Sequence, residues 1–298
     1  MPYPISRIMQ RSFALEQQGV IHVWDVDKTY LDTHFSSLEG MATIPIEFAV
    51  DKRAFPGMPE LLRALRWGGE QSYACVPIIF VTASPPQLRK VLARKMLLDG
   101  VEWDGIVFKN WLAVLASGYW RRLREQLAFK LCALLSCRLL WPLRDEFLYG
   151  DDTESDPEAF ALYTRIIHHE LSAAQTEVLL RERGVSRPDR RNVHALVQRL
   201  PIERGRVRQA FIHLAGHSPL SRFSDSEVLP VRHAAELALA LWEREQVRAD
   251  GCLRALNASL GAFSPVARRR ALDEATDRGL ISPARAAVLE QDELFAAH

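Results

Sequence analysis

The chain has 298 residues, of which 48% are hydrophobic and 25% are charged, and its formal net charge is +1. This is the composition of an ordinary globular protein with one large domain or two modest ones. A charge so close to zero gives no long-range field, which argues against non-specific binding to nucleic acid or to a membrane surface as the main function.

Neither the cysteines nor the N-terminus suggests secretion. The sequence contains four cysteines, at positions 75, 132, 137 and 252. They match no zinc-binding spacing and no disulfide framework. The N-terminus lacks a continuous apolar segment, and the most apolar stretch, 127–143, is too short and too charged to span a bilayer. We therefore expect a cytoplasmic protein without a transmembrane segment.

Short apolar runs alternate with helical patterns between about residues 20 and 170. The predicted strands cover 20–24, 76–81, 106–108 and 146–149. The predicted helices cover 59–66, 86–98, 123–136 and 156–169. Strands and helices that alternate in this way predict an α/β fold with a parallel sheet flanked by helices.

The chain after residue 170 is mainly helical in pattern. Helical spacing covers 172–183, 190–200, 226–247 and 265–278. The segment 206–214 is an exception, because its β-branched and aromatic residues favour a strand. We therefore divide the chain into a core, 1–170, and a mainly α-helical region of unknown role, 171–298. Within the second region, 205–215 is a candidate further strand of the core sheet.

Polar side chains follow three of the predicted strands. They are Asp25, Asp27, Thr82, Ser84, Asp151, Asp152 and Asp156. Ligands of open parallel sheets bind beyond the carboxyl ends of the strands, so these groups should converge. Several carboxylates in one place repel one another, and a hard cation such as Mg²⁺ removes that cost. Each acid alone is better explained by a turn or a helix N-cap, Asp156 above all. Their joint occurrence favours a metal site.

The same residues resemble a known superfamily. The stretch Asp25-Val-Asp-Lys-Thr29, the strand that ends in Thr82, then Lys130, and finally Gly150-Asp-Asp-Thr-Glu-Ser-Asp156 are ordered like the four motifs of the haloacid dehalogenase (HAD) superfamily. Within it, the stretches 80–88 and 150–158 resemble the phosphatidate phosphatase catalytic-domain family. The resemblance covers about residues 20–170 and implies a Rossmann-like, HAD-like fold for the core.

The resemblance implies a phosphomonoester hydrolase that acts through an aspartyl-phosphate. Asp25 would be the nucleophile, and Asp27 the general acid and base. Thr82, Ser84 and Lys130 would bind the phosphoryl group. Lys130 would also offset the negative charge of Asp25.

The resemblance also implies Mg²⁺ as the cofactor. Its ligands would be Asp25, Asp151, the backbone carbonyl of Asp27 and a further acid. Asp156 is the first choice for that acid, and Asp152 is the alternative.

Three residues of interest also have simpler explanations. Lys130 lies in an apolar helix and could reach solvent along it. His213 and His217 have the spacing of a metal-binding pair only if their segment is helical, and we expect no metal there.

The predicted site shows no extra cap domain in 31–55 or in 84–130, although the C-terminal helices could serve as one. An uncapped site suits a bulky phosphoester such as phosphatidate, which would imply transient contact with a membrane surface. A phosphoprotein or a polynucleotide end is an alternative substrate. A non-catalytic HAD-like regulatory or partner-binding module is the alternative function, but the intact acids of the first motif favour an enzyme.

Overall fold

The computed structural model describes residues 3–12, 14–32, 53–69, 75–116, 125–224, 226–261 and 265–291. The chain packs into two compact units. The first unit comprises Met1–Thr29, Pro77–Lys90 and Trp103–Pro230, and the second comprises Tyr30–Val76, Val91–Glu102 and Val231–His298. These units cross the predicted boundary at residue 170, so the division into functional domains stays a prediction.

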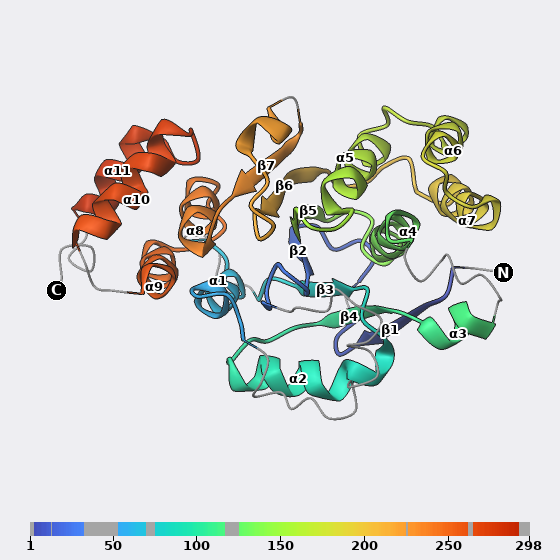
Figure 1. The fold of residues 1–298 in the computed structure, drawn as a ribbon, viewed down its shortest axis with the longest axis horizontal. Coiled ribbons are helices and arrows are strands. Elements are labelled where there is room, and N and C mark those ends of the chain that lie inside the picture. Colours follow the sequence, from blue (N-terminus) through green and yellow to red (C-terminus); the bar gives the residue numbers. More distant parts are fainter. Residues whose placement is uncertain are drawn as a thin grey trace. The chain divides into compact units, whose positions relative to one another are not determined.

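A mostly parallel sheet forms the centre of the first unit (Figure 1). In the described residues it has seven strands: β1 (Ile5–Met9), β2 (Val20–Asp25), β3 (Ile78–Thr82), β4 (Gly105–Lys109), β5 (Asp145–Asp151), β6 (Val207–His213) and β7 (Val228–Val231). Their order is β1-β4-β3-β2-β5-β6-β7. The five strands from β4 to β6 in this order run parallel, whereas β1 is antiparallel to β4.

Helices cover this sheet and also make up the second unit. The helices of the first unit are α3 (Trp111–Ala116), α4 (Leu127–Arg138), α5 (Asp156–Ile167), α6 (Ala173–Glu182) and α7 (Arg187–Gln198). Those of the second unit are α1 (Met58–Leu65), α8 (Ala234–Glu243), α9 (Ala249–Leu260), α10 (Pro265–Asp277) and α11 (Pro283–Glu290). The helix α2 (Arg89–Leu98) contributes residues to both units.

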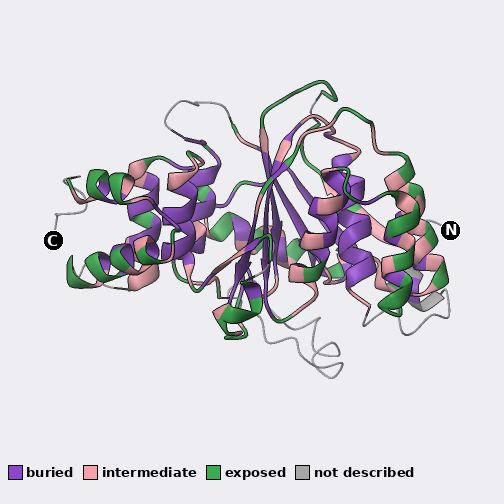
Figure 2. Cartoon of the chain, turned by 90° about the horizontal axis from the view of Figure 1, so that it is seen from above, coloured by how far each residue is buried: buried purple, intermediate pink, exposed green. Residues whose placement is uncertain are grey.

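The four strands β2 to β5 are buried along almost their whole length (Figure 2). Alternate residues of β2 and β3, such as Val23 and Val81, belong to one apolar core with α4 and α5. Every residue of α4 is buried, which makes it the central helix of this core. The other alternate positions include aromatic residues, and the rings of Trp24 on β2 and Tyr149 on β5 stack with centroids 4.0 Å apart. Burial on both faces explains why the strands read as continuous apolar runs in the sequence.

The strand order reverses between β2 and β5. From β2 the chain moves outward through β3 to β4, then returns to β5 on the other side of β2 and continues to β6. The carboxyl ends of the two strands at such a reversal border a crevice in which ligands bind. Asp25 and Asp151 are the last residues of β2 and β5, so the topology places both acids at this point.

The main architecture matches the sequence prediction, since the structure is a mixed α/β fold with a mostly parallel sheet flanked by helices. The continuous helix expected over 226–247 is wrong, because β7 precedes a helix that begins only at Ala234. No sequence pattern predicted β1, α9 or α11. Among the described residues, no helix is long and apolar enough to cross a membrane.

Candidate metal and phosphate site

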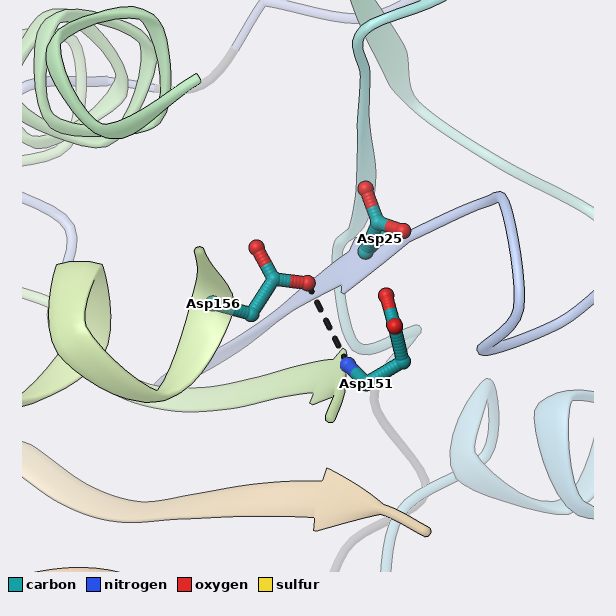
Figure 3. A group of neighbouring side chains, drawn as sticks. All are labelled: Asp25, Asp151 and Asp156. Carbon is teal, nitrogen blue, oxygen red and sulfur yellow. Dashed lines mark hydrogen bonds between the residues drawn. The ribbon is translucent and has the colours of Figure 1, made fainter. Parts of the chain in front are cut away.

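Three aspartates converge at the carboxyl edge of the sheet. Asp25 ends β2, Asp151 ends β5, and Asp156 begins α5. Figure 3 shows their carboxyl groups directed toward a common space. One carboxylate oxygen from each lies within 4.8 Å of the others, and all three residues are buried. Two ligands of one Mg²⁺ ion lie at most roughly 4 Å apart, so small side-chain rotations would let a single ion contact all three.

Two oxygens of this triad lack partners in the described part of the chain. Asp25 Oδ2 and Asp151 Oδ2 are buried and accept no hydrogen bond there. Buried polar atoms in native proteins are nearly always satisfied, so these two neighbouring carboxylate oxygens are suited to bind a cation. The three carboxylates therefore suit a hard divalent cation, which prefers oxygen ligands.

Asp156 does not act as the helix N-cap that was its simpler explanation. The N-cap position belongs to Ser155. The Asp156 carboxylate instead accepts a hydrogen bond of 3.2 Å from the backbone N–H of Asp151 (Figure 3). This bond ties the third acid to the second, and it follows from the five-residue spacing between them.

Lys130 does not extend to solvent along its helix. Its side chain is only 1% exposed, and its ammonium group forms ion pairs with Asp25 and, at 2.8 Å, with Asp156. Burial alone would lower the pKa of Lys130, but the two carboxylates raise it well above its ordinary value. The lysine therefore stays charged and offsets one of the negative charges of the triad.

The remaining negative charge of the triad is unfavourable without a further cation. Burial raises the pKa of Asp25 well above its ordinary value; Lys130 opposes this shift, and the other acids add to it. Burial also raises the pKa of Asp151 to about 7, with Asp156 adding to the shift. Carboxyl groups that resist ionisation at neutral pH are those that a divalent cation would stabilise when ionised.

Asp27 lies beside the hydroxyl groups that follow β3. One oxygen of its carboxylate accepts hydrogen bonds from Thr82 Oγ1 at 2.9 Å and from Ser84 Oγ at 3.1 Å. The Ser84 amide in turn donates to Thr82 Oγ1. The Asp27 side chain is not one of the three converging acids, and a metal contact through its backbone carbonyl stays a prediction.

The side chain of Asp152 faces a different part of the first unit. Its two carboxylate oxygens accept hydrogen bonds from the backbone N–H groups of Gly216 and Ser218. The three converging acids include Asp156 and not Asp152. The geometry thus favours the first of the two predicted choices for the further metal ligand.

Comparison with known proteins agrees with this geometry. The sequence model of a family described as phosphatidate phosphatase APP1, catalytic domain, matches residues 20–178, which is more than half of the chain. The chain belongs to this family. The family is one of phosphatases, and its name implies a phosphorylated lipid as substrate. No curated protein and no solved structure matches the chain.

The sequence analysis missed two charged residues near the site. Both lie in the part of the chain that matches the family model, 20–178. Glu154 accepts a hydrogen bond from Gln126, and burial raises its pKa although the charge of Lys130 opposes the shift. Lys109, the last residue of β4, is buried and donates to the carbonyl oxygen of Glu125 at 2.6 Å. Burial lowers its pKa to about 8. The position of Glu154 between Asp151 and Asp156 was the available sequence signal.

Gly150 allows Asp156 to reach its position. A Cβ atom at residue 150 would lie 2.5 Å from Asp156 Oδ2 and 2.6 Å from Asp156 Cβ. Gly150→Ala should therefore displace the acid, destabilise the fold by about 1–3 kcal/mol and reduce phosphatase activity at least roughly tenfold. Thermal unfolding and aryl phosphate hydrolysis measure the two effects.

A second glycine provides the control. Gly184 has φ of 73°, but nothing lies within 4 Å of the added Cβ. Gly184→Ala should therefore cost about 1 kcal/mol of stability through backbone strain alone and leave the activity unchanged. Equal loss of activity in both variants would contradict a specific role for Gly150.

The raised pKa of Asp151 also predicts a pH dependence. The folded protein binds the proton of Asp151 more tightly than the unfolded chain does, because the pKa is about 7 in the folded state and lower in the unfolded state. This difference stabilises the fold fully at pH values below the unfolded pKa. This contribution is lost as the pH rises through 7. The melting temperature of the metal-free protein should therefore contain a component that falls between about pH 4 and about pH 7. Because a cation held by these acids would bind their ionised form, the rise in melting temperature on adding Mg²⁺ should grow over the same interval.

Thermal unfolding with and without Mg²⁺ at constant ionic strength checks this dependence. Asp151→Asn removes the titrating group and should flatten the Mg²⁺-induced shift. A shift of the same size at every pH would contradict the prediction.

Proposed function

We propose that this protein is a Mg²⁺-dependent phosphomonoester hydrolase that acts through an aspartyl-phosphate on Asp25. The observation that carries the proposal is the buried cluster of Asp25, Asp151, Asp156 and Lys130 at the reversal of strand order. All four residues lie within the part of the chain that matches the family. The strand order and the order of the motifs support a HAD-like fold and mechanism.

Asp25, Asp151 and Asp156 would hold Mg²⁺, as the convergence of the three carboxylates and the unpaired buried oxygens of Asp25 and Asp151 suggest. When bound, the ion neutralises negative charge on the phosphoryl group and on the carboxylates, which lets two anions approach each other. The backbone carbonyl of Asp27 would complete the protein ligands. Lys130 would contribute a permanent positive charge to the same pocket.

In the first step, a carboxylate oxygen of Asp25 attacks the phosphorus atom, and the bond from phosphorus to the ester oxygen breaks. The departing oxygen takes a proton from Asp27. In the second step, Asp27 removes a proton from a water molecule, which attacks the phosphorus of the aspartyl-phosphate. Inorganic phosphate leaves, and Asp25 and the protonated Asp27 are restored.

The hydrogen bonds of Asp27 support this role. Its carboxylate holds the Thr82 and Ser84 hydroxyl groups, which are donors suited to an anion. We propose that phosphoryl oxygens accept these two bonds when the substrate binds. Asp27 would then be released to exchange a proton with the ester oxygen or with water.

The proposed substrate is phosphatidate or a lipid phosphate of the same kind, as the family name suggests. The headgroup of such a lipid lies at a membrane surface, so the enzyme would contact that surface transiently. The cytoplasmic location predicted from the sequence stays a prediction.

The test is a phosphatase screen with Asp25→Asn as the blank. It compares phosphatidate in mixed micelles, a phosphopeptide, a nucleotide and a sugar phosphate. We expect release of phosphate from phosphatidate above all. Preference for the peptide or the nucleotide would show that the substrate belongs to that class and not to the lipid phosphates. The absence of activity on all four compounds would favour a non-catalytic module.

Metal removal tests the cofactor separately. EDTA should abolish hydrolysis of the best substrate, and an excess of Mg²⁺ should restore it. Because the cluster requires a divalent ion to balance its charge, a rate that is indifferent to both additions would rule out this mechanism.

A further inference from the structure

The turn that follows β6, residues 213–218, contacts both loops that carry the acids of the site. It lies beyond residue 178, where the family match ends. His213 is the last residue of β6 and pairs in register with Asp151 at the end of β5. The turn is therefore next to the triad although it is far from it in the sequence.

The first set of contacts holds the loop after β5. The Asp152 carboxylate accepts hydrogen bonds from Gly216 N at 2.6 Å and from Ser218 N at 2.7 Å, one on each oxygen. The Asp152 N–H donates to the carbonyl oxygen of His213 at 3.1 Å. Arg222 Nη1 adds a bond of 3.3 Å to the Asp152 carbonyl oxygen. Four bonds thus surround the residue next to Asp151.

The second contact holds the loop after β2. His213 is 5% exposed, and its Nδ1 lies 2.9 Å from the carbonyl oxygen of Lys28. Because a carbonyl oxygen can only accept, the Nδ1 atom carries the proton. Lys28 directly follows Asp27 and has a φ of 60°, a left-handed conformation that costs energy for a residue with a side chain. A buried donor on its carbonyl helps to keep the backbone in that conformation.

Gly216 brings the turn close to the second loop. A Cβ atom there would lie 2.8 Å from Thr153 Cγ2 and 3.1 Å from Asp152 Oδ1. The glycine has no positive φ, so the close approach alone requires it. Any residue larger than glycine at position 216 would therefore push the turn away from the loop that follows β5.

We propose that the 213–218 turn is a positioning element of the site, in which His213 and Gly216 fix the loops of Asp27 and Asp151 relative to each other. The inference rests on the proposed metal-dependent phosphatase function and extends it beyond the matched family segment. Neither residue touches the reacting atoms. Each acts through the loop that it holds, as residues behind metal ligands do in other proteins.

The experiment compares His213→Leu, His213→Asn and Gly216→Ala with the wild type, each as the 298-residue chain. It measures kcat and KM for an aryl phosphate, and the rise in melting temperature as Mg²⁺ is titrated. His213→Leu and Gly216→Ala should lower kcat and weaken the apparent Mg²⁺ affinity, each roughly 10–100-fold, with little change in KM. In His213→Asn the amide nitrogen can take the place of Nδ1, and most of the activity should return.

The matched control is His217→Asn. His217 lies in the same turn and is exposed, and asparagine tolerates its φ of 58°. This variant should behave like the wild type. If His213→Leu fails to fold, Gly216→Ala, which changes an exposed residue, decides the question.

The outcomes separate the two proposals. If the wild type shows neither activity nor a Mg²⁺-induced shift, the phosphatase function fails and the positioning role fails with it. If the wild type shows both and the folded variants match it, only the positioning role is refuted. A lower melting temperature with an unchanged response to Mg²⁺ would also overturn it, because that is the result of a purely structural contact.

Discussion

Asp25→Asn should lower the rate of aryl phosphate hydrolysis by at least roughly 10³-fold, since an amide cannot serve as the attacking nucleophile. The expected loss is in kcat, because Thr82, Ser84 and Lys130, which we propose to bind the phosphoryl group, remain in place. The folded state should be nearly as stable as the wild type. Lys130 keeps its ion pair with Asp156, and one buried carboxylate is removed from a cluster of like charges. Steady-state kinetics and thermal unfolding on the same samples measure both effects.

Asp250→Asn is the matched control for this change. Asp250 lies on α9 and forms an ion pair with Arg254, with about half of its side chain exposed. The same substitution there should leave catalysis unchanged. Activity of Asp25→Asn within tenfold of the wild type would refute Asp25 as the nucleophile.

Lys130→Met should both inactivate and strongly destabilise the protein. The side chain of Lys130 lies between Asp25 and Asp156, and all three are almost fully buried. Removal of one partner leaves buried carboxylates without compensation, which typically costs about 3–5 kcal/mol. The loss should be smaller at acidic pH, because protonated carboxyl groups need no counter-charge. Mg²⁺ should restore part of the stability if it binds the same carboxylates.

Lys90→Met is the control, because Lys90 is exposed at the beginning of α2. Denaturant unfolding at two pH values, with and without Mg²⁺, measures the stability of both variants. A loss at Lys130 no larger than at Lys90 would show that the charge of the triad is balanced in some other way.

The parallel strands were predictable because burial on both faces leaves them apolar throughout. The run Val20–Trp24 and the run that ends in Thr82 are examples, and each ends where polar residues begin. The strand β1 was not predictable, because its residues are partly exposed and it forms by pairing with the distant β4. The strand β7 was hidden by apolar residues whose spacing continues into α8.

The convergence of Asp25 and Asp151 was predictable, because each ends a strand and the topology of a parallel sheet brings such ends together. The choice between Asp152 and Asp156 as the further metal ligand could not be made from the sequence, since the spacing of both acids fits that role. It depended on Gly216 and Ser218, whose N–H groups engage Asp152. The role of His213 was not predictable either, because its partner, the Lys28 carbonyl, lies 185 residues earlier in the chain.

The two strands that flank the matched segment have a practical consequence for anyone who wishes to isolate the catalytic part. Residues 20–178 contain β2 to β5 but neither β1 nor β6. Trimming the protein to those limits would leave β4 and β5 as bare outer strands, and such strands recruit other chains into aggregates. Expression of the whole polypeptide is therefore the safer starting point for crystallisation.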